Sequence, residues 1–286
     1  MCVPPLVSWA PMDRHLLAIA VGLAAGLLAA LGWLLRTRPW RGARPRFPVV
    51  LAHGLFGFDA IGVGGFKQDY FRGVVAHLRG LGVEVQVPAV PPAASIATRA
   101  EALAEAVRAL PAKKVNIIAH SMGGLDARYA ISRLGLSDRV ASLITVGTPH
   151  RGTPVANAAA SVLGELLGLR RWLSGVGVEA LFDLTTDHLA DFNRSVPDAR
   201  GVHYACVVGV GPRVGGPVHP LLRPGLTYMR DRFGPNDGVV PAASQRWGKV
   251  IATVHADHWA MIGWSDGIDA PALYERLSRK LRSWGL

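Results

Sequence analysis

The stretch that most constrains the fold is a strand–turn–helix pattern at residues 113–129, with the sequence KKVNIIAHSMGGLDARY. Residues 115–119 are a short apolar run rich in β-branched side chains, which predicts a buried strand. The turn HSMGG at residues 120–124 interrupts this run, and residues 125–134 have the pattern of a helix. A serine on a tight turn between a strand and a helix is typical of a nucleophile elbow, with Ser121 as the nucleophile.

An ordinary polar turn is the alternative at this place, because short strings of this kind also occur by chance. The usual pattern is G-x-S-x-G, and here Ala119 takes the place of the first glycine. A serine hydroxyl is a weak nucleophile alone, but the elbow exposes its Oγ next to a base and to the amide N–H groups of the helix start. The strand before Ser121 and the helix after it favour the catalytic interpretation.

Apolar strand-like runs alternate with helical patterns from residue 47 onwards. We expect strands at 47–52, 83–87, 115–119, 140–146, 201–210 and 249–254, and helices at 69–78, 95–110, 125–134 and 271–284. This alternation predicts an α/β fold with a mostly parallel central sheet covered by helices on both faces. Ser121 then lies at the carboxyl end of a central strand, where α/β sheets place their sites.

Residues 16–35 are 20 consecutive residues without a charged side chain. A helix of this length crosses the hydrocarbon core of a bilayer, which is about 30 Å thick. Trp33 and Trp40 lie where interfacial aromatic side chains are expected. A cleaved secretory signal is the alternative, but its apolar part is usually shorter, and no clean A-x-A-type site follows. We therefore expect a transmembrane anchor after a tail of residues 1–15.

Five arginines fall in residues 36–46, which predicts a basic linker lying on anionic headgroups. The folded α/β domain then covers residues 47–286, with an insertion at about 150–200. The excess of arginines after the anchor favours a cytoplasmic domain, and an extracytoplasmic domain is the alternative. The net charge of +11 does not indicate a nucleic-acid partner, because the other basic residues are scattered without an aromatic-interleaved stripe.

A serine nucleophile needs a base, and the base needs an orienting carboxylate, in the chain order Ser, Asp or Glu, His. Asp237 is the best acid, because it lies in the turn NDGVV after an irregular stretch, although an ordinary Asx turn has the same appearance. His255 and His258 both follow the last predicted strand, and their spacing does not decide between them.

Two backbone N–H groups must stabilise the oxyanion. We expect one from Met122, next to the serine, and one from Leu55, in the turn HGLFG after the first strand; a plain loop is the alternative there. Supporting roles are expected for His53, Gly54, His120 and Gly123. Neither a cofactor nor a metal is indicated, since no Cys/His spacing of the metal-binding type occurs. Cys2 lies outside the predicted domain, so no disulfide with Cys206 is expected within it.

The sequence resembles the bacterial triacylglycerol lipases of the α/β-hydrolase superfamily. Five segments carry the resemblance in the family's order: FPVVLAHGLFGFDAIG, KKVNIIAHSMGGLDARY, ASLITVGTPHRGTP, NDGVVPAASQRWG and DHWAMIG. The resemblance implies Ser121 as nucleophile, Asp237 as acid and His258, rather than His255, as base. Ala260 replaces an acid that binds calcium in many relatives. A calcium site would have to use Asp257, Asp266 or Asp269, and we expect none.

An apolar stripe at residues 155–169 has the spacing i, i+3, i+4, i+7, and small residues occupy much of the opposite face. This segment is either a core helix or a mobile lid over an acyl groove.

The function predicted is hydrolysis of carboxylic esters of lipids. An acyltransferase or a polyester depolymerase would use the same residues, and a catalytically idle, membrane-tethered binding module is the alternative from another class. The oligomeric state is not indicated.

Overall fold

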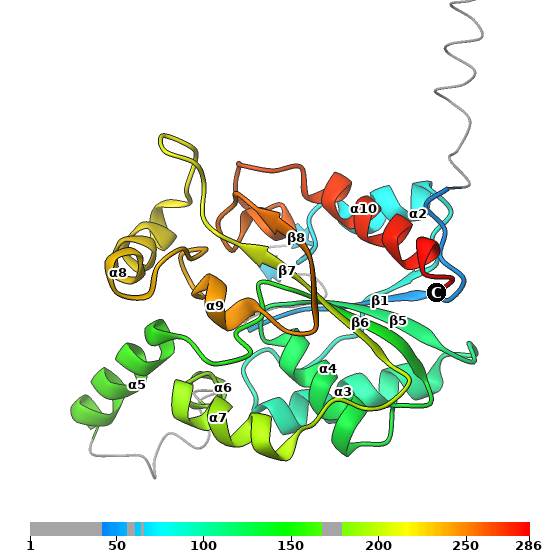
Figure 1. Cartoon of the computed structure of the whole chain (residues 1–286), viewed down its shortest axis with the longest axis horizontal. Helices are drawn as coiled ribbons and strands as arrows, with labels where there is room; N and C mark the ends of the chain where they lie inside the picture. The colour runs from blue at the N-terminus through cyan, green and yellow to red at the C-terminus, as the bar shows by residue number, and fades with distance from the viewer. Residues whose placement is uncertain (1–41, 56–60, 64–65, 168–178) are drawn as a thin grey trace, which may run out of the picture. The chain divides into compact units, whose positions relative to one another are not determined.

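A six-stranded sheet in the order β4-β1-β5-β6-β7-β8 forms the centre of the computed structural model, which describes residues 42–55, 61–63, 66–167 and 179–286 (Figure 1). Every pairing between neighbouring strands of this sheet is parallel. The strands are β1 (Val49–Ala52), β4 (Val85–Gln86), β5 (Val115–His120), β6 (Val140–Val146), β7 (His203–Gly209) and β8 (Lys249–Val254).

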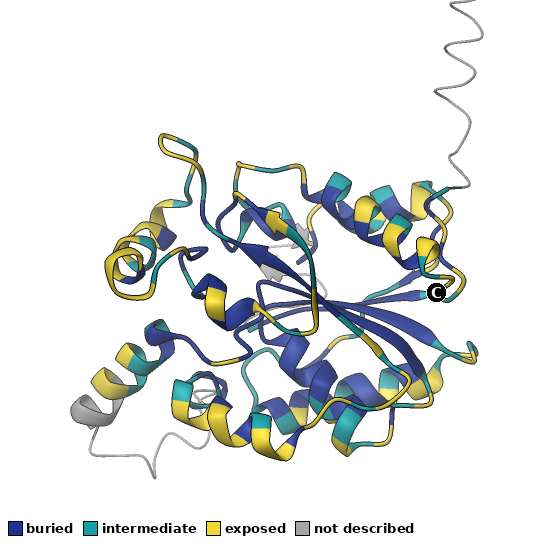
Figure 2. Cartoon of the chain, in the orientation of Figure 1, coloured by how far each residue is buried: buried dark blue, intermediate teal, exposed yellow. Residues whose placement is uncertain are grey.

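The two inner strands β5 and β6 are buried along their whole length. Strands covered on both faces have near-continuous apolar sequences, and the runs VNIIAH and VASLITV have this character. In Figure 2 the centre of the sheet is accordingly dark blue, while exposed residues lie mainly on the outer sides of the helices and in loops. The predicted α/β class with a parallel sheet is confirmed.

Two pairs of helices cover the two faces of the sheet (Figure 1). On one face, α2 (Val74–Gly80) and α10 (Ala270–Ser283) contact each other and share a core cluster with β1 and β8. On the other face, α3 (Ile96–Ala109) and α4 (Gly123–Arg133) pack together over β1, β5 and β6. These layers bury the apolar sides of the helices against the sheet, which is the main stabilising contact in folds of this class.

Several short elements escaped the sequence analysis. They are the antiparallel hairpin of β2 (Ile61–Val63) and β3 (Phe66–Gln68), the helices α6 (Glu179–Asp183), α7 (Thr186–Ser195), α8 (Arg223–Phe233) and α9 (Ala242–Gln245), and the 3₁₀ turns η1 (Pro220–Leu222) and η2 (Ala260–Ile262). We expected an irregular stretch before the turn NDGVV, and α8 lies there. Pro224 occupies the first turn of α8, where no N–H is needed.

Helix α5 (Pro154–Leu167) includes the apolar stripe after β6. Of its side chains up to residue 162, only Pro154 and Ala156 are buried, and Val162 is 53% exposed. This part of α5 is therefore not a core helix. The predicted anchor at residues 16–35 lies outside the described residues, and no helix within them combines the length and apolar character needed to cross a bilayer.

Candidate active site

Ser121 lies on the turn that joins β5 to α4 and has a φ of 55°. Within the described part of the chain it is the only residue other than glycine with a positive φ. This left-handed conformation is strained for an L-residue and persists only where the surroundings enforce it. The Ser121 N–H donates to the Val146 carbonyl at 2.9 Å, and the Thr148 hydroxyl donates to the Ser121 carbonyl at 2.8 Å. The expected elbow geometry is present.

Gly123 allows the helix of the elbow to begin directly against the end of β1. A Cβ at this position would lie 2.6 Å from the Ala52 carbonyl oxygen and 2.7 Å from the His53 carbonyl oxygen. Both contacts are with backbone atoms, which cannot move away as the end of a flexible side chain can. A glycine two residues after the serine is therefore required by the close approach of the end of β1 and of the oxyanion turn, which we define as residues 53–55.

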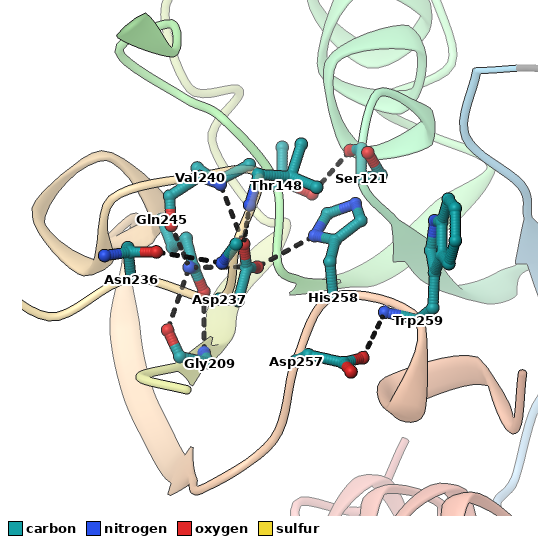
Figure 3. Close-up of polar contacts among 12 residues, drawn as sticks. Ser121, Thr148, Gly209, Asn236, Asp237, Val240, Gln245, Asp257, His258 and Trp259 are labelled. Atoms are coloured by element: carbon teal, nitrogen blue, oxygen red, sulfur yellow. Dashed lines mark hydrogen bonds and ion pairs between the residues drawn. The ribbon is translucent and has the colours of Figure 1, made fainter. Parts of the chain in front are cut away.

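Asp237 and His258 form a buried pair at the same edge of the sheet, with 2.8 Å between His258 Nδ1 and Asp237 Oδ2. Figure 3 shows the imidazole between this carboxylate and Ser121. Because the carboxylate can only accept, Nδ1 carries the proton, and Nε2 is left as a proton acceptor. No hydrogen bond joins His258 to Ser121 in this structure; such bonds commonly tighten only when substrate is bound.

The Asp237 carboxylate is held by donors on both of its oxygens. The backbone N–H groups of Val239 and Val240 donate to Oδ1 at 3.0 and 2.7 Å, which is the geometry of an Asx turn. The Gln245 amide donates to Oδ2 at 3.2 Å and bonds both backbone groups of Gly209 at the end of β7 (Figure 3). Gln245 was missed by the sequence analysis, although it lies in the segment NDGVVPAASQRWG.

The two candidate histidines lie in different environments. His258 is 4% exposed and contacts Asp237, whereas His255 is exposed at the end of β8. Gly147, with φ of 62°, leaves the space for the pair: a Cβ there would lie 3.3 Å from Asp237 Oδ2 and from His258 Cε1. The structure therefore brings His258, and not His255, next to the acid.

The Leu55 and Met122 N–H groups donate no hydrogen bond to any described residue. Met122 directly follows the serine, and Leu55 follows Gly54, where an added Cβ would lie 2.7 Å from Ser121 Cβ. The rest of the oxyanion turn is anchored: the Gly54 N–H donates to the Tyr70 hydroxyl at 3.1 Å, and His53 Nδ1 donates to the Gly54 carbonyl at 3.1 Å. The two free donors fit the role of an oxyanion hole.

Arg99 of α3 holds the carbonyl side of the oxyanion turn. Its guanidinium donates to the His53 carbonyl at 2.7 Å and to Asp126 of α4 at 2.9 Å, and the side chain is fully buried. Burial raises the pKa of Asp126 to about 7, although Arg99 acts in the opposite direction. No feature of the sequence around Arg99 distinguished it from the other basic residues of a helix, so it was missed.

Two of the three acids considered for calcium, Asp257 and Asp269, are engaged within the protein, and Asp266 is exposed. Asp257 Oδ1 accepts from the backbone N–H groups of Trp259 and Ala260 and from the Ser265 hydroxyl, and Oδ2 accepts from the His219 N–H. Asp269 caps the start of α10 through the Ala272 N–H. In the part of the chain that the structure describes, no three His, Cys, Asp or Glu side chains gather in a way that could hold a metal.

A family model described as alpha/beta hydrolase fold matches residues 48–173. A triacylglycerol lipase of Vibrio cholerae serotype O1 is 31% identical over 293 residues, which cover 84% of this chain and 89% of that protein. A triacylglycerol lipase of Pseudomonas fragi is 29% identical over 292 residues, which cover 84% of this chain and 98% of that protein. The chain belongs to the α/β-hydrolase family of lipases and esterases.

Among solved structures, the enzyme is similar to a carboxyl esterase of metagenomic origin, with a TM-score of 0.68 and 21% identity over 83% of this chain and 76% of that one. This likeness shows the shared fold. Membership of the family makes the protein a carboxylic-ester hydrolase of the lipase type, which confirms the function predicted from the five segments.

Proposed function

We propose that the enzyme cleaves lipid esters with Ser121 as nucleophile, His258 as general base and Asp237 as the residue that orients the imidazole. One observation carries the proposal: the strained Ser121 and the Asp237–His258 pair lie at the same edge of the sheet (Figure 3). The three residues follow the chain order of the fold class. The mechanism uses side chains and backbone groups of the chain and calls for no cofactor.

In the first step His258 Nε2 takes the proton of the Ser121 hydroxyl while Oγ attacks the ester carbonyl carbon. The imidazolium that forms is stabilised by Asp237, which is fully buried and fixed by Gln245 and two backbone N–H groups. The Leu55 and Met122 N–H groups receive the oxyanion. His258 then protonates the leaving alcohol, and a water molecule activated by the same residue hydrolyses the acyl-enzyme.

The relatives described above are named for triacylglycerols, so we propose that the substrates are esters with long acyl chains. Helix α5 supports this proposal, because Val162 is 53% exposed and, of its side chains up to residue 162, only Pro154 and Ala156 are buried. An apolar helix of this kind acts as a lid when it moves at a lipid surface and uncovers an acyl groove.

The test compares the full-length wild type with Ser121→Ala on p-nitrophenyl esters of short and long chains and on emulsified triacylglycerol. We expect kcat to fall by about 10⁴-fold or more in the variant, as after removal of a triad nucleophile. Equal rates above the uncatalysed rate would refute Ser121 as the nucleophile, and rates of both proteins no higher than the uncatalysed rate would leave a binding module. Wild-type transfer of the acyl group to an added alcohol in preference to water would indicate an acyltransferase, and release of soluble oligomers from a polyester film would indicate a depolymerase.

We further propose that residues 16–35 anchor the protein in the cell membrane and that the arginines of residues 36–46 keep the domain near anionic lipid. The charge bias favours a cytoplasmic domain, with an extracytoplasmic one as the alternative. Extraction with alkaline carbonate tests the anchor: a full-length chain that leaves the membrane would refute it. Cleavage of the domain by protease added to intact spheroplasts would be consistent with the anchor and would show that the domain is extracytoplasmic.

A further inference from the structure

The oxyanion turn and the catalytic histidine come from distant parts of the chain, yet catalysis requires a fixed distance between them. The oxyanion turn follows β1 at residues 53–55, and His258 follows β8. These two strands are not neighbours in the sheet, because β5, β6 and β7 lie between them. Strand pairing therefore connects the two segments only through three intervening strands, and a direct connection between them must come from side chains.

Two buried side chains connect these segments by hydrogen bonds. The Gly54 N–H lies 3.1 Å from the Tyr70 hydroxyl oxygen, and this oxygen lies 2.8 Å from His120 Nδ1. His120 Nε2 lies 3.1 Å from the backbone carbonyl oxygen of His258. The chain of bonds thus runs from the oxyanion turn to the residue proposed as the base, and it passes behind Ser121, which directly follows His120.

One arrangement of protons satisfies every bond in this chain. The Gly54 N–H must donate to the Tyr70 oxygen, and the His258 carbonyl must accept, so His120 carries its proton on Nε2. His120 Nδ1 then accepts from the Tyr70 hydroxyl. All donors point in the same direction, from Gly54 towards His258, and such aligned chains polarise one another.

Burial keeps both side chains in the uncharged forms that this arrangement needs. Tyr70 is 8% exposed and His120 is 1% exposed. The pKa of His120 is lowered well below 6.5, first by burial and then by the nearby His258, and burial raises the pKa of Tyr70. A neutral His120 also adds no positive charge beside the imidazolium that forms at His258, whose ring centre lies 4.5 Å away.

We propose that Tyr70 and His120 are positioning residues that hold the oxyanion turn and the backbone of His258 at a fixed separation around Ser121. The inference rests on the proposed roles of His258 and Leu55. Arg99 anchors the carbonyl side of the oxyanion turn, and Tyr70 anchors its N–H side at Gly54. With both sides fixed, the Leu55 N–H is held towards the developing oxyanion, and its placement depends on the Tyr70 bond.

The test uses full-length Tyr70→Phe, His120→Ala and His120→Gln, with steady-state kinetics on a soluble p-nitrophenyl ester and melting temperatures for each. Tyr70→Phe removes the hydroxyl and keeps the ring. The Gln side chain can still donate an N–H to the His258 carbonyl, whereas Ala removes both bonds. Ser142→Ala is the matched control, because Ser142 donates a buried hydrogen bond of 2.7 Å to Asn116 near the amino ends of β5 and β6, away from the site.

We expect Tyr70→Phe and His120→Ala each to lower kcat by about 10- to 100-fold with KM changed less than about threefold, since a small misplacement of reacting groups has this effect. His120→Gln should recover at least about fivefold of the kcat that His120→Ala loses. The double variant Tyr70→Phe/His120→Ala should be no slower than the worse single variant by more than about threefold, because both break one chain.

The control Ser142→Ala should have a lower melting temperature than wild type and an unchanged kcat. The inference is overturned if Tyr70→Phe and His120→Ala keep kcat within about threefold of wild type, or if their effects multiply in the double variant. It is also overturned if Ser142→Ala, at an equal loss of melting temperature, loses as much kcat. Ser121→Ala separates this failure from that of the proposed function, because a fully active Ser121→Ala would refute the triad itself.

Discussion

Replacing Gly123 by Ala tests whether the oxyanion turn keeps its position because residue 123 has no side chain. The new Cβ would lie 2.6 Å from the Ala52 carbonyl oxygen and 2.7 Å from that of His53. A Cβ essentially never approaches another heavy atom more closely than 3.0 Å. The backbone must therefore withdraw by about 0.4 to 0.8 Å. Ala52 is held in the sheet by its pairing with Ala119, whereas the oxyanion turn that begins at His53 lies beyond the strand and is displaced more easily.

The magnitude follows from what this movement does to the Leu55 N–H. If the donor is displaced beyond hydrogen-bond reach of the oxyanion, the loss equals that of one oxyanion-hole donor, about 10²- to 10³-fold in kcat, or about 3 to 4 kcal/mol. Overpacking costs a further ~1–3 kcal/mol of stability. Because the oxyanion forms only in the transition state, KM should change little.

Gly80→Ala is the matched control, because Gly80 is the exposed last residue of α2 and a Cβ there meets nothing within 4 Å. It should raise the free energy of unfolding by about 0.5–1 kcal/mol and leave kcat unchanged. Steady-state kinetics on a soluble ester, with urea unfolding of each variant, measure both effects. A folded Gly123→Ala variant that keeps kcat within threefold would refute the argument that this contact seats the oxyanion turn.

Three further predictions concern the base, the metal and the pH dependence. His258→Ala should lose about 10³-fold or more in kcat/KM, while the exposed His255→Ala stays within about tenfold; kinetics with the reverse order would overturn the assignment. Chelator treatment should leave activity and melting temperature unchanged, because Asp257 accepts only protein donors; a loss restored by calcium would contradict this. Burial lowers the pKa of His150 well below 6.5, so as pH falls below 6.5 the unfolded chain binds a proton that the folded chain lacks. Wild type should then lose ~1.4 kcal/mol per pH unit relative to His150→Gln in urea unfolding, and parallel curves would refute this.

Much of the sheet was predictable because its strands are short apolar runs with clear ends. The bounds of β6 and β8 are those expected, and β5 extends one residue further, to His120. Helix α8 was not predictable, since it is mostly exposed, buries Met229 alone along its length, and carries its proline where a helix tolerates it. Local pattern predicts elements that bury a face, and it fails for those held by one or two contacts.

The candidate site divides in the same way. Ser121 and the order of acid and base can be read along the chain, because the elbow is a local structure. Choosing His258 over His255 required the family resemblance, and only the fold shows its contact with Asp237. Gln245 and Arg99 act through buried contacts across 8 and 27 residues of chain, and no sequence pattern marks such side chains.

The φ of 55° at Ser121 places thermal stability and catalytic activity in conflict. Glycine adopts this backbone shape without a steric penalty, whereas a serine there costs roughly 1–2 kcal/mol. A selection that rewards only thermal stability should therefore favour Ser121→Gly, although this exchange removes the nucleophile. Engineering this enzyme for thermal stability needs an activity screen in each round, since one of the simplest stabilising exchanges in the sheet region is also the one that ends turnover.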